Sequence, residues 1–170
     1  MRGLVVYASH YGTTRQYAVW IATELGFECI EAVKGIPDPS GYDCIIMGGS
    51  VYAGGWLLRK WVEQHAGILV RKRVYGFTVS TTPPEKTGEH DAVVLKNLPK
   101  NLQEGTPFWH FGGAIDVGKL RFFHRILFRM VMSMSKSPDA GEHKRNGVDY
   151  VSRGSILPLL ERVKDDCRQN

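Results

Sequence analysis

The residues best suited to chemistry in this chain form a short turn rich in hydroxyl groups. An apolar segment of strand length, residues 4–8, leads directly into Ser9-His10-Tyr11-Gly12-Thr13-Thr14, where a helical pattern begins. The amino end of a helix offers unpaired backbone N–H groups and the positive end of its dipole. Ser9, Thr13 and Thr14 add hydroxyl donors, and Gly12 lets a ligand approach the backbone closely. The turn therefore predicts an anion site.

The spacing within this turn narrows the kind of anion. A triphosphate loop needs Gly-x-x-x-x-Gly-Lys-Ser/Thr and a dinucleotide site needs Gly-x-Gly-x-x-Gly, and the turn has neither pattern. Its pattern, Ser-x-x-Gly-x-Thr, offers neutral donors without a lysine to grip a triphosphate, which suits a terminal phosphate monoester such as that of FMN. The alternative is a structural turn in which Ser9 or Thr13 only caps the helix.

Two further loops rich in glycine or hydroxyl groups follow predicted strands. The first spans residues 48–56 and contains Ser50-Val51-Tyr52-Ala53-Gly54, and the second contains Ser80-Thr81-Thr82. A flat redox ring needs backbone donors and acceptors along its polar edge and a planar or apolar group on its face. Gly54 and Gly55 allow a loop peptide to reorient. Tyr52 or Trp56 is a candidate for the face, with ordinary packing at the sheet edge as the alternative.

Strand-like and helical patterns alternate along the chain and bring these loops to one edge. Runs of strand length occur at residues 3–8, 27–33, 42–49, 73–80 and 106–113. Helical patterns occur at residues 13–25, around 57–62, at 88–98 and at 153–168, where Pro158 disturbs the start. This alternation predicts a doubly wound α/β fold with five parallel strands, and such folds bind ligands at the carboxyl ends of their strands.

Composition and charge limit the compartment and the partners. A chain of 170 residues with 43% hydrophobic content fits one globular domain, residues 1–170. Cys29, Cys44 and Cys167 are odd in number and far apart, which favours the reducing cytoplasm and supports neither a disulfide framework nor a metal site. We expect no signal peptide and no membrane span. The net charge of +5 is unlike that of an acidic electron carrier, and without a recognition motif it predicts no nucleic-acid partner.

The three loops together resemble the FMN-binding loops of the flavodoxin family. The resemblance is carried by Ser9-x-x-Gly12-x-Thr14, Gly49-Ser50-Val51-Tyr52-Ala53-Gly54 and Ser80-Thr81-Thr82, and it covers nearly the whole chain. It implies strand order 2-1-3-4-5 and tightly but noncovalently bound FMN. The cofactor-binding residues that it implies are Ser9, His10, Tyr11, Gly12, Thr13, Thr14, Ser50, Val51, Tyr52, Ala53, Gly54, Ser80, Thr81, Thr82 and Gly113. Tyr11 stands where the family commonly has threonine or serine, so one phosphate hydroxyl is missing.

A narrower set of motifs resembles the menaquinone-dependent protoporphyrinogen IX dehydrogenase branch of that family. It comprises Tyr42-Asp43, the Gly-Ser-x-x-x-Gly loop, Gly113-Ala114 and a segment ending in Met132-Ser133-Met134-Ser135. This resemblance implies an FMN-dependent oxidoreductase that passes electrons from a porphyrinogen to a membrane quinone. The alternative is a soluble flavodoxin-like electron carrier that docks on a protein redox partner. No catalytic side chain is assigned; His124 is a candidate proton acceptor, with simple packing as its alternative.

A basic amphipathic helix is predicted within an insert at about residues 115–147, after the fifth strand. Arg121, Arg125 and Arg129 are four residues apart and form one stripe of a helix, while the opposite side is apolar. Such a helix suits the headgroup region of an anionic membrane on the inner face of the cell. The expected membrane or substrate contacts are Arg121, Phe122, Phe123, Arg125 and Arg129. Packing on the protein's own surface and a dimer interface are the alternatives, and the oligomeric state stays open.

Overall fold

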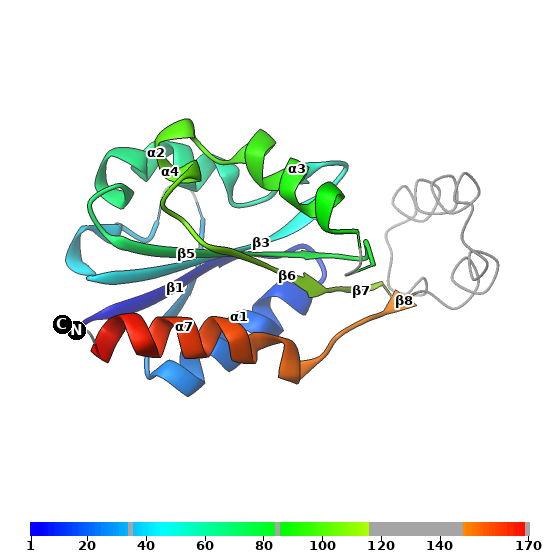
Figure 1. Cartoon of the computed structure of the whole chain (residues 1–170), viewed down its shortest axis with the longest axis horizontal. Helices are drawn as coiled ribbons and strands as arrows, with labels where there is room; N and C mark the ends of the chain where they lie inside the picture. Colours follow the sequence, from blue (N-terminus) through cyan, green and yellow to red (C-terminus); the bar gives the residue numbers. More distant parts are fainter. Residues whose placement is uncertain (34–35, 84–85, 116–147, 169–170) are drawn as a thin grey trace.

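The computed structural model describes residues 1–33, 36–83, 86–115 and 148–168 and contains a parallel sheet (Figure 1). Its parallel strands are β1 (Gly3–Ala8), β2 (Glu28–Glu31), β3 (Cys44–Tyr52), β5 (Arg73–Ser80) and β6 (Phe108–Gly112). They lie in the order β2-β1-β3-β5-β6. The short strand β4 (Gly55–Trp56) pairs with β3 and is antiparallel to it, so it is not one of the five parallel strands. Counted without β4, the five strands lie in the predicted order 2-1-3-4-5, and the structure confirms that prediction.

Helices cover both faces of the sheet (Figure 1). One face carries α1 (Thr13–Leu25) and α7 (Leu157–Arg168), and the other carries α2 (Arg59–Leu69), α3 (Thr87–Asn97) and α4 (Lys100–Gln103). Alternate strand residues point to opposite faces, so Val5 packs into the cluster beneath α1 and α7, while Leu4 and Val6 pack into the cluster beneath α2. A strand that is covered on both faces therefore reads as a continuous apolar run in the sequence.

The segment after the third strand is a hairpin, where a loop was expected. Strand β3 continues to Tyr52, and β4 returns beside it with Val51 opposite Trp56 and Tyr52 opposite Gly55. The two residues at the tip, Ala53 and Gly54, both have positive φ, at 49° and 73°. Two-residue hairpin loops need this backbone, which glycine adopts without steric cost. The hydrophobic pattern gave no sign of the reversal because β4 has only two residues.

The C-terminal α-helix begins four residues later than the predicted start at residue 153. Residues Arg153–Ile156 form a 3-10 turn, η2, and α7 starts at Leu157, which places Pro158 in the first helical turn. Proline is tolerated there because the N–H groups of that turn have no intrahelical acceptor. A second 3-10 turn, η1 (Pro39–Gly41), precedes β3.

The predicted insert is bracketed by a small antiparallel ladder. Strand β7 (Ala114–Ile115) pairs with β8 (Val148–Asp149), so the chain leaves the sheet after Ile115 and returns at Val148. The predicted helix and its contacts, Arg121, Phe122, Phe123, Arg125 and Arg129, lie outside the described residues. In the described part of the chain, no helix is long and apolar enough to cross a membrane.

Candidate functional site

The three loops singled out in the sequence leave the sheet at one edge. Strand β1 pairs with β3 up to Ala8 opposite Gly49, and β3 pairs with β5 up to Ser50 opposite Val79. The neighbouring strands run parallel, so β1 and β5 end at this level, while β3 continues for two residues into the hairpin with β4. The residues following β1, β3 and β5 therefore share the carboxyl edge of the sheet, as predicted for the ligand site.

The turn after β1 leaves the first backbone N–H groups of α1 without a side-chain cap from the part of the chain that the structure describes. Gly12 is the N-cap of α1 with φ at 90°, a backbone that glycine adopts readily, and it donates its N–H to Ser9 Oγ at 3.0 Å. No side chain in the described residues caps α1, so neither Ser9 nor Thr13 acts as the helix cap. Thr14 is 1% exposed, and its Oγ1 has no hydrogen-bond partner among the described residues. The turn thus combines uncapped amides with an unsatisfied hydroxyl.

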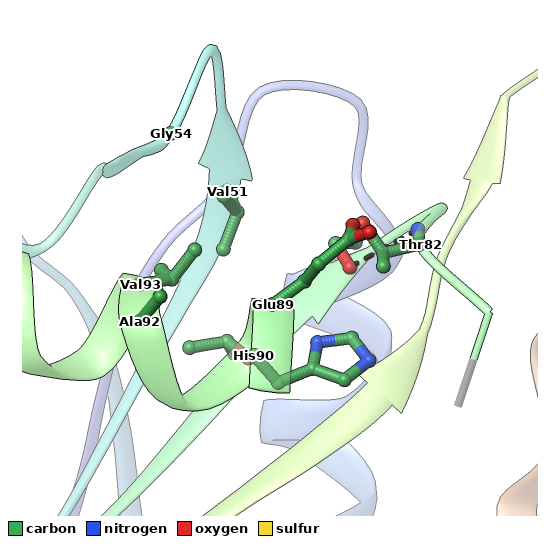
Figure 2. Close-up of a pocket in the computed structure, with 9 residues that line it drawn as sticks. Val51, Gly54, Thr82, Glu89, His90, Ala92 and Val93 are labelled. Carbon is green, nitrogen blue, oxygen red and sulfur yellow. Dashed lines mark hydrogen bonds between the residues drawn. The ribbon is translucent and has the colours of Figure 1, made fainter. Parts of the chain in front are cut away.

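The ends of β3 and β5, the loops that follow them and α3 border a cavity of about 340 Å³. Ser50, just before its rim, has a buried Oγ that finds no partner in the described part of the chain. On the other loop, Ser80 Oγ accepts the Thr82 N–H at 3.2 Å. Figure 2 shows Val51 and Gly54 on one side and Thr82 on the other. The lining residues are Val51, Gly54, Thr78, Ser80, Thr82, Glu89, His90, Ala92 and Val93.

Residues 4–141 match the family model described as a flavodoxin domain. The chain belongs to the flavodoxin domain family. This flavodoxin domain is 25% identical over 146 residues to the protoporphyrinogen IX dehydrogenase [quinone] of Escherichia coli K12, which covers 79% of this chain and 81% of the relative. Proteins with the same name from two other E. coli strains, O6:H1 and O157:H7, match equally well.

One solved structure agrees with this assignment at the level of the fold. The domain is similar to oxidised flavodoxin 2 from Bacillus cereus, with a TM-score of 0.51 and 22% identity over 66% of this chain and 84% of that chain. It is also similar to a flavoprotein in complex with FMN from Lactobacillus acidophilus, with a TM-score of 0.48 and 18% identity over 65% of this chain and 91% of that one.

The structure brings some predicted residues of this flavodoxin domain into the cavity and leaves others at its margin. Val51, Gly54, Ser80 and Thr82 line it. His10 and Tyr52 meet edge to face, with ring centroids 6.0 Å apart, which joins the first loop to the second. Other predicted residues lie on the three loops or on the adjoining ends of α1 and β3 without lining the cavity: Ser9, Tyr11, Gly12, Thr13, Thr14, Ser50, Ala53 and Thr81.

Gly113 supports the third loop through its backbone. Its N–H donates to the Ser80 carbonyl at 2.6 Å, and its own carbonyl accepts from the Tyr150 N–H at 3.1 Å. A side chain at Gly113 would press on that Ser80 carbonyl. Gly113 therefore holds the β5 loop against the end of β6.

Trp56 belongs to the core. It is 4% exposed and packs edge to face on Phe108 with ring centroids 5.6 Å apart, so packing at the sheet edge is the interpretation that holds. Its indole Nε1 lies over Gly49, where any side chain would overlap it. Tyr52, which is half-buried beside His10, is the remaining aromatic candidate on this loop.

The sequence interpretation missed the wall of the cavity that α3 supplies. Glu89, His90, Ala92 and Val93 all come from this helix. The sequence did contain a signal for this wall, because His90 and Asn97 are seven residues apart and so lie on one face of a helix. In the structure both side chains are buried. Two polar side chains on the inward face of an amphipathic helix indicate a site or a hydrogen-bond network.

His90 of this wall is paired with a second histidine. His90 from α3 stacks on His110 from β6, and His110 Nδ1 shares a 2.6 Å hydrogen bond with Thr78 Oγ1. His90 Nε2 lies 3.2 Å from the Pro83 carbonyl and donates to it, which ties α3 to the β5 loop. Burial and the nearby His90 lower the pKa of His110 to about 4, so its imidazole is neutral at physiological pH.

Proposed function

We propose that this flavodoxin domain binds FMN at the carboxyl edge of its sheet and acts as an FMN-dependent oxidoreductase. The observation that carries the proposal is a pair of buried hydroxyls, Thr14 Oγ1 and Ser50 Oγ, that lack a partner among the described residues. Thr14 lies in the first turn of α1 and Ser50 near the end of β3, at the edge where this fold takes its ligands. A buried polar group without a partner costs about 1–3 kcal/mol, which a ligand with acceptors at both positions would recover.

The first loop suits the phosphate end of FMN. The uncapped amides of α1 and the hydroxyls of Ser9, Thr13 and Thr14 are neutral donors, which suit a single terminal phosphate. The helix dipole adds a favourable field for the anion. Binding at this end is thus expected to depend on backbone geometry and hydroxyls, with no lysine in the turn.

The cavity between the second and third loops suits a flat ring. Its volume of about 340 Å³ lies in the range of ligand pockets, and Val51, Ala92 and Val93 contribute apolar groups to its walls. Ser80 and Thr82 offer polar groups on the other side. When bound, FMN would supply the redox chemistry, and the chain would orient it and limit the access of solvent.

Flavin titration tests the cofactor. We expect the purified protein to bind FMN, with quenching of flavin fluorescence, and to bind riboflavin at least tenfold more weakly because riboflavin lacks the phosphate. Equal affinity for the two would contradict the phosphate site, and no binding of either would refute the proposal as a whole.

The second part of the proposal concerns the route of the electrons: from a porphyrinogen through FMN to a quinone. The support is the similarity to a relative named for both, over 79% of this chain. The propionates of such a substrate require cations, and Arg121 and Arg125 in the segment outside the described residues are candidates. The same segment, with its arginines spaced by four, is proposed to contact an anionic membrane surface from the cytoplasmic side.

Anaerobic reduction tests this route. We expect a porphyrinogen to bleach the bound flavin within seconds to minutes and a menaquinone analogue to restore its colour. A protein that is reduced only by another redox protein, and is not reoxidised by the quinone, would be a soluble electron carrier instead.

A further inference from the structure

Asn97 joins α3 to the hairpin that borders the cavity. It is the last residue of α3 and is 3% exposed. Its Oδ1 accepts the Trp56 N–H at 3.0 Å, and its Nδ2 donates to the Gly54 carbonyl at 3.0 Å and to the Val93 carbonyl at 2.8 Å. One buried amide thus satisfies three backbone groups, two of them on the hairpin and one on the helix.

The hairpin tip needs such support. Ala53 and Gly54 both have positive φ, and for Ala53 this left-handed backbone is unfavourable because its Cβ approaches the backbone. Strand β4 has only two residues, so the ladder to β3 supplies little pairing on its own. Without an external contact, the tip would have little to hold it in one conformation.

The helix also covers the tip. The Lys96 Nζ lies 3.6 Å from the position that a Cβ on Gly54 would take. Figure 2 shows Gly54 above the cavity and Val93 of α3 beside Val51, so the helix that holds the tip also lines the cavity. A substitution at Asn97 is therefore expected to alter the position of Gly54, which borders the cavity together with Val51.

We propose that Asn97 is a positioning residue that preorganises the hairpin tip for the ring end of the ligand. The inference rests on the proposed function, because it assumes that the flavin ring occupies the cavity. Asn97 does not contact the ligand. It commits the Gly54 carbonyl to the helix and fixes the conformation of residues 52–56 before the ring arrives, so binding does not have to order them.

The most informative variant is Asn97→Asp. Aspartate keeps the oxygen that accepts the Trp56 N–H but removes both N–H donors, so it releases the Gly54 and Val93 carbonyls. Asn97→Ala removes all three bonds without burying a carboxylate, and it keeps the test available if Asn97→Asp does not fold.

A matched control lies on the neighbouring helix. Gln103 Nε2 in α4 donates to the carbonyls of Leu95 and Leu98, at 3.0 and 2.7 Å. Gln103→Glu therefore also removes two amide donors from the end of α3, but it leaves the hairpin untouched. It reports what general loosening of this helix end does to the ligand site.

Flavin affinity and hydrogen exchange together test the inference. We expect Asn97→Asp and Asn97→Ala to lower the affinity for FMN and the affinity for riboflavin by the same factor, about tenfold, because both flavins share the ring that the hairpin contacts. Gln103→Glu should change neither affinity by more than about twofold. Backbone amides of residues 52–56 should exchange faster in the ligand-free Asn97→Ala protein than in wild type and Gln103→Glu.

Three results would overturn the inference, and they can be told apart. If wild type binds FMN but Asn97→Ala matches Gln103→Glu, Asn97 is only part of the helix end and the proposed function stands. If the substitution lowers the affinity for FMN but not for riboflavin, Asn97 acts on the phosphate site and not on the ring site. If wild type binds no flavin, the proposed function itself fails and this inference fails with it.

Discussion

His90 and His110 lie face to face, with ring centroids 4.4 Å apart and ring planes 18° from parallel. Two imidazolium ions cannot share that spacing without strong repulsion, so the pair holds at most one charge readily. Through Pro83 and Thr78 the pair connects α3, β5 and β6 at the wall of the cavity. The stability of this corner should therefore depend on pH.

The first prediction concerns His110. Its pKa falls from 6.5 to about 4 on folding, through burial and then through His90, with Asp91 acting weakly the other way. The unfolded chain takes up this proton below pH 6.5, and the folded protein resists it until about pH 4. Stability from this group is thus complete above pH 6.5 and is lost as the pH falls toward 4.

Urea unfolding at several pH values checks this prediction. His110→Asn keeps a polar group for Thr78 and does not titrate, so its free energy of unfolding should fall less than that of wild type between pH 6.5 and 4.5. Carboxyl groups whose pKa is lowered, such as Asp38 and Asp166, titrate in both proteins and cancel in the comparison. Parallel curves would show that His110 has no such role.

The second prediction concerns the unsatisfied hydroxyl of Thr14. Thr14→Val preserves the shape and removes the buried Oγ1, so the ligand-free protein should be as stable as wild type or slightly more stable. FMN affinity should fall about tenfold to a hundredfold, because a hydrogen bond to a charged group contributes about 1.5–3 kcal/mol. Riboflavin affinity should not change.

Thr106→Val is the control for that experiment. Thr106 is also a buried threonine, at 9% exposure, but it precedes β6 and so lies at the amino edge of the sheet, away from the three loops. It should leave both flavin affinities unchanged. A loss of riboflavin affinity in Thr14→Val would place this hydroxyl near the ring and contradict the assignment of the phosphate end.

The third prediction concerns the close approach of Trp56 to Gly49. A methyl group at Gly49 would overlap the indole ring, which is buried and cannot move away freely. Gly49→Ala should cost about 1–3 kcal/mol of unfolding free energy, as overpacking does in other cores. Because Trp56 lies in the hairpin, flavin affinity should fall as well.

Gly67→Ala is the control, and it should raise the free energy of unfolding where Gly49→Ala lowers it. Gly67 lies within α2, and beyond its chain neighbours and the local helix backbone no atom of the described residues comes within 4 Å of a Cβ placed there. Alanine should therefore stabilise the helix by about 0.5–1 kcal/mol. Chemical denaturation measures both changes, and a neutral Gly49→Ala would mean that the hairpin yields more easily than its burial indicates.

The fourth prediction concerns the arginine segment outside the described residues. Wild type should co-sediment with anionic liposomes, less so as salt is raised, because each basic residue near such a surface contributes about 1 kcal/mol. Replacing Arg121, Arg125 and Arg129 by glutamate should abolish recovery while leaving FMN binding intact. Equal recovery of wild type and the triple variant would count against membrane contact.

Much of the fold followed from local patterns. Central strands covered on both faces show continuous apolar runs, and the ends of α1 are marked by the hydroxyl-rich turn before it and by Gly26 after it. The hairpin after Gly49 was missed because a strand of two residues has no period to detect. The start of α7 was displaced because η2 and an α-helix share almost the same side-chain spacing.

The sequence by itself determined which loops bear hydroxyls and glycines and that parallel strands bring them to one edge, because those properties depend on residue type and strand direction. Only the tertiary structure decided that α3 forms a wall of the cavity, that Trp56 belongs to the core and that Asn97 holds the hairpin tip. These are contacts between residues far apart in the chain, such as Asn97 with Gly54, and local periodicity carries no information about which distant backbone group a buried amide will reach.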